Sequence, residues 1–150
     1  MSKNTRFLTH AAVIAALYAV LTHLQNVLLP GSTTWAIQMR LSEALCVLSF
    51  FTPAAIPGLT VGCLVFNITY AAALPLDFLV GSLATLLAAG GMWLTRRVTV
   101  KGYPLVGMAM PALFNALLVG WELTVYIGGG FFLNALYVAL GELAVLLTFG

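Results

Sequence analysis

The sequence predicts an all-α integral membrane protein, a bundle of six transmembrane helices in one domain covering residues 1–150. Composition is the first observation: 62% of the residues are apolar and only 7% are charged, whereas soluble domains carry roughly 25% charged residues. The mean hydropathy of +1.07 is the second. The third is a series of six apolar runs, each near the length that crosses a bilayer. Together they exclude a soluble enzyme, a nucleic-acid-binding protein and a disordered chain.

The six expected spans are separated by residues that break helices. A helix needs about 20 residues to cross a hydrocarbon core of ~30 Å. Pro30, Pro53 and Pro75 follow the first three spans. A helix is expected to end before each of them, because proline lacks a backbone donor and restricts the residue before it. The basic segment 96–102 follows the fourth span, and the glycines 128–130 form the last turn. The expected spans are Phe7–Leu24, Trp35–Phe51, Gly58–Leu74, Phe78–Thr95, Pro104–Tyr126 and Phe131–Phe149.

The cations predict the orientation of these spans. Cytoplasmic loops of membrane proteins carry an excess of lysine and arginine. Six spans place the N-terminus and the loop between spans four and five on one side, so both termini are expected in the cytoplasm. The cations on that side are Lys3, Arg6, Arg96, Arg97 and Lys101. Arg40 alone falls on the outer side. A cleaved signal peptide is the alternative for the first span, but no small-x-small cleavage site follows Leu21.

The sequence carries no motif for catalysis. A phosphate-binding loop, a zinc-protease motif and a nucleophile elbow are all absent, and His10 and His23 fall at opposite ends of one expected helix. Cys46 and Cys63 lie in separate apolar runs without a C-x-x-C pattern, which indicates buried free thiols rather than a metal or redox site. We therefore expect neither an enzyme nor a bound metal.

Polar side chains within the expected spans gather mostly in the outer half of the bundle. Ionisable groups are costly in a bilayer and usually face the bundle interior or a water-filled cavity. Carboxylates and amides among aromatic rings suit a flat heterocycle with several N–H donors, so we expect a small-molecule pocket open to the outside. Its candidate residues are Glu122, Glu43, Arg40, Asn67, Asn115, Trp35, Tyr70, Trp121, Asp77, Asn134 and Glu142.

Structural roles compete with ligand binding at several of these positions. Arg40 and Glu43 lie three residues apart, so an interfacial ion pair is the alternative there. Asn67 and Asn115 have the alternative of joining helices by hydrogen bonds. Glu122 shares its helix with no cation and is the first choice for the donor edge of a ligand, with Glu43 second. Glu142 lies deeper and fits either a pocket floor or a structural group.

Small residues form a stripe along the first expected helix. Such a stripe allows a second helix to approach closely, either within the same bundle or from a partner subunit. The same two readings apply to the Gly58-x-x-x-Gly62 pattern in the third span. The residues of the stripe are Ala11, Ala12, Ala15, Ala16 and Ala19.

Two segments carry a resemblance to a known family. The segment from Gln38 to Leu45 (QMRLSEAL) resembles the R-x-S-E-A-L segment that opens helix two in the QueT family. The first-helix segment from Ala11 to Tyr18 is similar to the alanine-rich first helix of many S components, and is less specific. The chain thus resembles, over nearly its whole length, an S component, the substrate-binding subunit of an energy-coupling factor (ECF) transporter.

The resemblance implies a function that composition does not. QueT proteins are assigned to uptake of queuosine precursors, which are 7-deazaguanine bases such as queuine and its precursors. S components capture substrate outside and dock through helix one onto a membrane scaffold (T) subunit driven by two cytoplasmic ATPases. ATP is then used by the partners, and the chain itself needs no cofactor. The alternatives are a proton-coupled carrier using Glu122 or Glu142 and a scaffold subunit that binds no ligand.

Overall fold

The computed structural model describes residues 2–33, 40–70 and 73–149, and these form an all-α bundle. Within those residues the only β-type pairing is an isolated bridge between Val100 and Tyr103. All six expected spans contain helix, which confirms the predicted all-α class. The elements are α1 (Lys3–Leu28), the 3-10 helix η1 (Leu41–Phe50), α2 (Ala55–Thr69), α3 (Asp77–Thr95), α4 (Leu105–Met108), α5 (Met110–Tyr126) and α6 (Phe131–Phe149).

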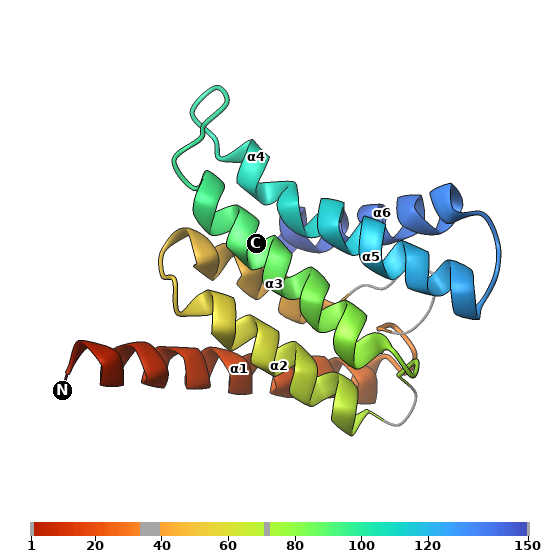
Figure 1. Cartoon of the computed structure of the whole chain (residues 1–150), viewed down its shortest axis with the longest axis horizontal. Helices are drawn as coiled ribbons and strands as arrows, with labels where there is room; N and C mark the ends of the chain where they lie inside the picture. Colours follow the sequence, from red (N-terminus) through yellow and green to blue (C-terminus); the bar gives the residue numbers. More distant parts are fainter. Residues whose placement is uncertain (1, 34–39, 71–72, 150) are drawn as a thin grey trace.

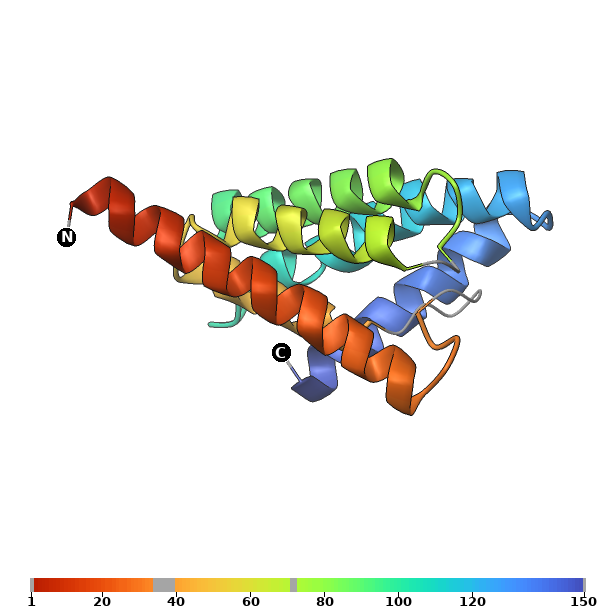
Figure 2. The same ribbon diagram turned by 90° about the horizontal axis from the view of Figure 1, so that it is seen from below.

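The helices surround η1. Helices α1, α2, α3, α5 and α6 pack each against the next, and η1 contacts α1, α2, α3 and α6. Figure 1 shows α2, α3 and α5 following one another across the molecule, with α1 along one side. In Figure 2, α1 crosses the other helices obliquely, and its N-terminal end extends beyond them. The second expected span therefore supplies the segment that most other elements contact.

Among the residues that the structure describes, four helices are long and apolar enough to cross a membrane by length and composition. They are α1, α3, the joined α4–α5 segment Leu105–Tyr126, and α6. The segment η1, with 10 residues, and α2, with 15, are shorter than a full crossing. The spans expected at Trp35–Phe51 and Gly58–Leu74 thus differ in extent from η1 and α2. Helix α2 starts at Ala55, before the expected Gly58. Pro57 does not prevent this start, because it falls in the first turn, where proline is tolerated.

The surface and the interior have the polarity of a membrane protein. Large apolar side chains face outward all round, such as Val27 at 75%, Phe132 at 86% and Leu147 at 75% exposure. The interior instead contains an arginine and four carboxylic acids together with its apolar core. Because soluble proteins rarely expose contiguous apolar surface of this kind, this distribution supports a lipid-embedded bundle.

The 3-10 geometry of η1 aligns four polar residues. Side chains three positions apart lie one above another in a 3-10 helix, which has about three residues per turn. Arg40, Glu43, Cys46 and Ser49 follow that spacing along η1 and its N-cap, and all four are buried. An α-helix would rotate each successive member of this series away from the previous one. We call these four residues the η1 polar stripe.

The fifth expected span is interrupted at Ala109. Helix α4 ends at Met108 and α5 begins at Met110, with Pro111 in the first turn of α5. Proline has no N–H to donate and its ring crowds the carbonyl four residues earlier, here that of Gly107. The break therefore follows from Pro111, and it corrects the expectation of one continuous span over Pro104–Tyr126.

Glycines of α2 bring its backbone into contact with α1. A Cβ atom on Gly62 would lie 2.7 Å from the carbonyl oxygen of Ala15 and 2.7 Å from Cβ of Tyr18. A Cβ on Gly58 would lie 2.8 Å from the carbonyl oxygen of Ala11. The Gly58-x-x-x-Gly62 pattern therefore serves packing within this bundle, and it fixes the position of Tyr18.

Candidate functional site

Arg40, Asp77 and Glu122 come together in the interior from three different elements. Arg40 precedes η1, Asp77 begins α3, and Glu122 lies in the last turns of α5. Arg40 Nη2 lies 3.9 Å from Asp77 Oδ1, and the carboxyl group of Glu122 interacts electrostatically with both residues. The three side chains are 4%, 1% and 0% exposed. With Asn67 of α2, which touches Asp77, they form what we call the Arg40 cluster.

Contacts from α2 and α3 hold Arg40 in place. Its Nη1 atom donates to the sulfur of Cys63 at 3.6 Å, and its guanidinium lies 5.7 Å from the ring centroid of Phe66. A Cβ on Gly81 would lie 3.6 Å from the same Nη1 and 2.9 Å from Nδ2 of Asn67. The glycine at position 81 therefore leaves room for the arginine and the amide to meet α3.

Asp77 is fixed by the backbone around it. Its Oδ2 atom accepts from the backbone N–H of Leu74 at 3.1 Å, and its carbonyl oxygen accepts from Asn67 Nδ2 at 2.8 Å. The first bond closes the turn before α3, and the second ties α3 to α2. Because one carboxylate oxygen makes the turn, the other is left for Arg40.

Many polar atoms of this region have unused hydrogen-bonding capacity. Buried polar atoms in proteins nearly always have a hydrogen-bond partner. In the Arg40 cluster, the atoms without one are Arg40 Nε and Nη2, Asp77 Oδ1, Asn67 Oδ1 and both carboxyl oxygens of Glu122, and Asn115 Nδ2 elsewhere on α5 also has none. The cluster therefore offers acceptors and donors in one buried place, which is what recognition of a polar small molecule requires.

A second polar group lies one 3-10 turn further along η1. Tyr18 of α1 donates its hydroxyl hydrogen to Glu43 Oε1, and Cys46 Sγ donates to Glu43 Oε2 at 3.2 Å. Glu142 of α6 interacts electrostatically with Glu43, and its Oε2 atom has no hydrogen-bond partner among the described residues. All four are buried, and we call them the Glu43 cluster. In this structure Arg40 pairs with Asp77, which does not support the alternative of an Arg40–Glu43 ion pair.

Polar residues of α1 that sequence reasoning passed over hold η1. Thr22 donates to the hydroxyl of Ser42 at 2.7 Å, and Gln25 Oε1 accepts from the backbone N–H of Leu41 at 2.8 Å. With Tyr18 they are spaced by four and three residues, and all three are buried on one helix face. That spacing is visible in the sequence, but these three side chains are uncharged and therefore do not stand out in an apolar helix as ionisable residues do.

Two expected site residues lie away from these clusters. Trp121 is 50% exposed and lines an apolar groove with Leu79 and Leu118. It points outward because successive residues of a helix point about 100° apart and the next residue, Glu122, points inward. Asn134 donates from Nδ2 to Thr124 Oγ1 at 3.1 Å and to the carbonyl oxygen of Gly128 at 3.0 Å. It therefore braces the turn between α5 and α6.

The remaining expected site residues have intermediate positions. Tyr70 is half-buried and stacks on Phe66 with ring centroids 5.1 Å apart, so it reaches the Arg40 cluster through that ring. Asn115 is buried on α5 about two turns before Glu122. Trp35 lies outside the described residues.

The cysteines and acids give no sign of a metal centre. Cys46 and Cys63 are free and buried, which confirms the interpretation as buried thiols. Among residues 2–33, 40–70 and 73–149, no group of three or more histidine, cysteine or acidic residues is arranged to hold a metal ion.

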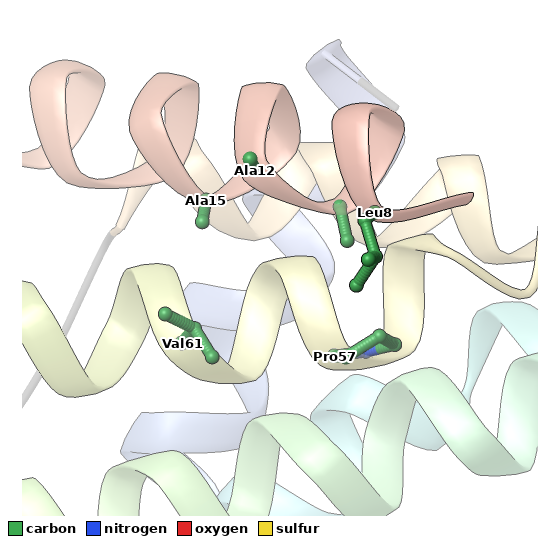
Figure 3. Close-up of a pocket in the computed structure, with 6 residues that line it drawn as sticks. Leu8, Ala12, Ala15, Pro57 and Val61 are labelled. Atoms are coloured by element: carbon green, nitrogen blue, oxygen red, sulfur yellow. The ribbon is translucent and has the colours of Figure 1, made fainter. Parts of the chain in front are cut away.

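The alanine stripe of α1 divides into two parts. Ala11 and Ala15 are half-buried and their carbonyl oxygens face the glycines of α2, whereas Ala12 and Ala16 are exposed. Figure 3 shows Leu8, Ala12 and Ala15 of α1 with Pro57 and Val61 of α2 around an apolar groove of about 270 Å³. Packing within the bundle therefore uses one part of the stripe and leaves the other on the surface.

Comparison with known proteins places the chain in a family. No curated protein and no solved structure matches the chain significantly. The model of the QueT transporter family matches residues 8–150, nearly the whole chain. That match confirms the resemblance carried by the segment Arg40–Leu45, and it indicates a transporter rather than an enzyme. The chain belongs to the QueT transporter family, a family of transporter S components.

Proposed function

We propose that this protein is the substrate-capture subunit of an ATP-driven ECF-type importer and binds a queuosine precursor, a 7-deazaguanine base. The observation that carries the proposal is the buried Glu122 carboxyl, which has unpartnered oxygens beside Asp77 and Arg40 in a chain of the QueT transporter family. Ionisable residues within a membrane bundle usually mark a substrate site.

Hydrogen-bonding capacity supports a deazaguanine as the ligand. The guanine-like edge of such a base presents adjacent N–H and NH₂ donors together with a carbonyl oxygen. Glu122 accepts from the two donors, since one carboxylate binds two parallel N–H groups well. Arg40 donates from Nε or Nη2 to the carbonyl oxygen, and the amides of Asn67 and Asn115 complete the edge. Tyr70, stacked on Phe66, offers a ring face to the base.

The position of the cluster along the helices supports capture from outside. Asp77 begins α3, whereas Arg96 and Arg97 follow the other end of that helix at Thr95. By the positive-inside rule the arginine end faces the cytoplasm of the bacterial cell, together with both termini. The Arg40 cluster then lies in the outer half of the membrane, where a substrate arrives.

ATP-driven delivery inward would take its ATPase from partner subunits, because the sequence carries no ATP-binding motif. We assign docking of the membrane scaffold subunit to the exposed part of the α1 stripe, which is Ala16 together with Ala12, the residue that lines the groove in Figure 3. Two cytoplasmic ATPase subunits would consume the ATP, so this chain uses no cofactor of its own.

Calorimetry on the purified protein tests the substrate. Queuine and its precursor bases are titrated into the parent protein and into the variant Glu122→Gln. Removing one partner of a buried charged contact costs about 2–5 kcal/mol, so affinity falls at least about 30-fold in the variant. The matched control is Trp121→Phe on the neighbouring, outward-facing residue, which binds as the parent does. Failure of every deazaguanine base to bind, or full affinity in Glu122→Gln, contradicts the proposal.

A proton-coupled carrier is the second candidate, favoured by the buried carboxyl groups of Glu122 and Glu142. Such a carrier takes up substrate in vesicles that contain this chain alone, driven by a pH gradient. An S component requires the scaffold and the ATPases. Uptake measured with and without those partners therefore separates the two functions.

A further inference from the structure

The acidic and basic side chains of this protein are separated between interior and surface. The chain has four acidic residues and six lysines and arginines. Every acid is at most 3% exposed, and Arg40 is 4% exposed. The surface therefore offers no acidic side chain to the five remaining cations, and a surface of one sign attracts a partner of the other. These cations are Lys3, Arg6, Arg96, Arg97 and Lys101.

Three of the five cations lie in the loop 96–103, which joins α3 to α4 and projects beyond the ends of both helices in Figure 1. We call it the basic loop. Val100 and Tyr103 exchange two backbone hydrogen bonds, of 2.8 and 3.1 Å, across Lys101 and Gly102. Both turn residues have a positive φ, 50° and 86°, as in the type I′ turn of a β-hairpin.

The lysine at the tip of this turn is not explained by the backbone. Among the described residues, Lys101 is the only one other than glycine with a positive φ. Asparagine or glycine fits that position with less strain. An unfavourable residue at an exposed tip therefore points to a role for its charge.

Arg96 is used by the fold, whereas Arg97 and Lys101 are free. The guanidinium of Arg96 lies 3.6 Å from the ring centroid of Trp93, and its Nη1 donates to the Trp93 carbonyl oxygen at 2.6 Å. It thus closes the C-terminal end of α3, where a cation is favourable. Arg97 and Lys101 are exposed, and neither side chain has a hydrogen bond or ion pair within the described part of the chain.

The basic loop also exposes apolar side chains on one side. Successive residues of an extended chain point to opposite sides, so Val98 and Val100 share a side. Tyr103 joins them, because it pairs with Val100 across the turn. The three are 49%, 44% and 68% exposed. Apolar and cationic side chains together at the end of a membrane helix suit the boundary between acyl chains and headgroups.

We propose that the basic loop lies in the headgroup layer of the membrane and that Arg97 and Lys101 bind the phosphate groups of anionic phospholipids. Cationic segments next to a membrane helix are attracted to acidic headgroups. The exposed apolar side of the loop favours a lipid surface over an acidic protein surface, since it can rest at the acyl boundary. By the positive-inside rule the lipids belong to the cytoplasmic leaflet. This interaction is independent of the ligand in the buried site.

Quenching of tryptophan fluorescence by brominated lipids tests the proposal at the loop itself. A protein with Trp35→Phe and Trp121→Phe keeps only Trp93, which contacts Arg96. Its vesicles contain equal amounts of phosphatidylglycerol and phosphatidylcholine, with bromine on one lipid or on the other. We expect phosphatidylglycerol to be preferred beside Trp93 by at least about fivefold, the effect of one cation near an anionic surface. Equal quenching by the two lipids overturns the proposal and leaves an acidic protein partner as the occupant of the loop.

Variants then locate the interaction. Arg97→Gln combined with Lys101→Gln should reduce the preference to within about twofold of equal quenching. Arg97→Lys combined with Lys101→Arg keeps both charges and should keep the preference. A protein that retains Trp121 alone reports on the other end of the bundle and should show no preference. A preference that survives the two glutamines, or an equal one at Trp121, overturns the assignment to the loop. If the tryptophan variants do not fold, native mass spectrometry of the parent and the glutamine variant compares the same two lipids.

Discussion

The Arg40 cluster and the contact between α1 and α2 are both built on glycines that admit a close neighbour, but they differ in what remains unsatisfied. At the α1–α2 contact, Gly58 and Gly62 meet backbone carbonyls and Cβ atoms, and the packing leaves no room for a methyl group. At Gly81 the neighbours are the ends of polar side chains, several of which keep unused donors and acceptors. A complete contact indicates a structural role, whereas a buried polar contact with spare capacity indicates a binding role.

Removing the guanidinium should give the largest loss of stability. Arg40→Met leaves Asp77 and Glu122 without their buried cation, and breaking a buried pair in this way costs about 3–5 kcal/mol. Thermal unfolding of the purified protein in detergent measures the effect. The control is Arg97→Met in the exposed loop after α3, which changes the free energy of unfolding by about 0.5 kcal/mol or less. Equal melting temperatures for the two variants would show that Arg40 does not contribute to the stability of the fold.

A methyl group at the α1–α2 contact should cost somewhat less. Gly62→Ala places a Cβ 2.7 Å from the Ala15 carbonyl oxygen, which belongs to backbone and cannot move alone, so we expect a loss of about 1–3 kcal/mol. Gly90→Ala on α3 is the control, because nothing lies within 4 Å of its added Cβ. Alanine favours helix there by up to about 1 kcal/mol. Unfolding measurements that rank Gly90→Ala below Gly62→Ala contradict this view of the contact.

The turn between α5 and α6 should show a smaller, purely structural effect. Asn134→Ala removes the bonds to Thr124 and to the Gly128 carbonyl, at about 1 kcal/mol for each bond. Because the amide braces a turn, affinity for a deazaguanine base should stay at the parent value. If the variant loses more free energy of binding than free energy of unfolding, measured on the same preparation, Asn134 belongs to the binding site after all.

The sequence predicted well those helices whose ends are set locally. The bounds of α6 agree at both ends with the expected span, because the glycines 128–130 form the turn before it. Helix α3 starts one residue before the expected Phe78. The geometry of η1 was not predicted, since a 3-10 run of this length is uncommon and depends on contacts from the helices around it. The spacing of three along its polar stripe was the available signal.

Depth in the membrane predicted which charged residues lie together in the interior, but it did not predict which way the aromatic residues face. Arg40, Asp77 and Glu122 meet because a bilayer leaves buried ionisable groups few places except next to one another. Trp121 is tolerated equally well facing lipid or ligand, so its depth gave no direction, and only the helical phase relative to Glu122 separates the two faces. The position of an ionisable side chain in a membrane bundle can therefore be predicted from sequence better than that of a tryptophan, because only the interior accommodates the charge.

Substitutions on the exposed part of the α1 stripe should change stability least and transport most. Ala12→Leu and Ala16→Leu add side chains to the exposed part of the α1 stripe, so the free energy of unfolding and the affinity for substrate should stay within about 0.5 kcal/mol of the parent. If this face docks the scaffold subunit, the added leucines block the close approach of another helix and abolish co-purification and uptake. Ala15→Leu is the contrasting variant, since Ala15 is half-buried with its carbonyl oxygen against Gly62, and a larger side chain there should lower stability as well. Uptake that survives both exposed substitutions would mean that the small residues of α1 serve only the contact with α2, and that any partner binds elsewhere on the bundle.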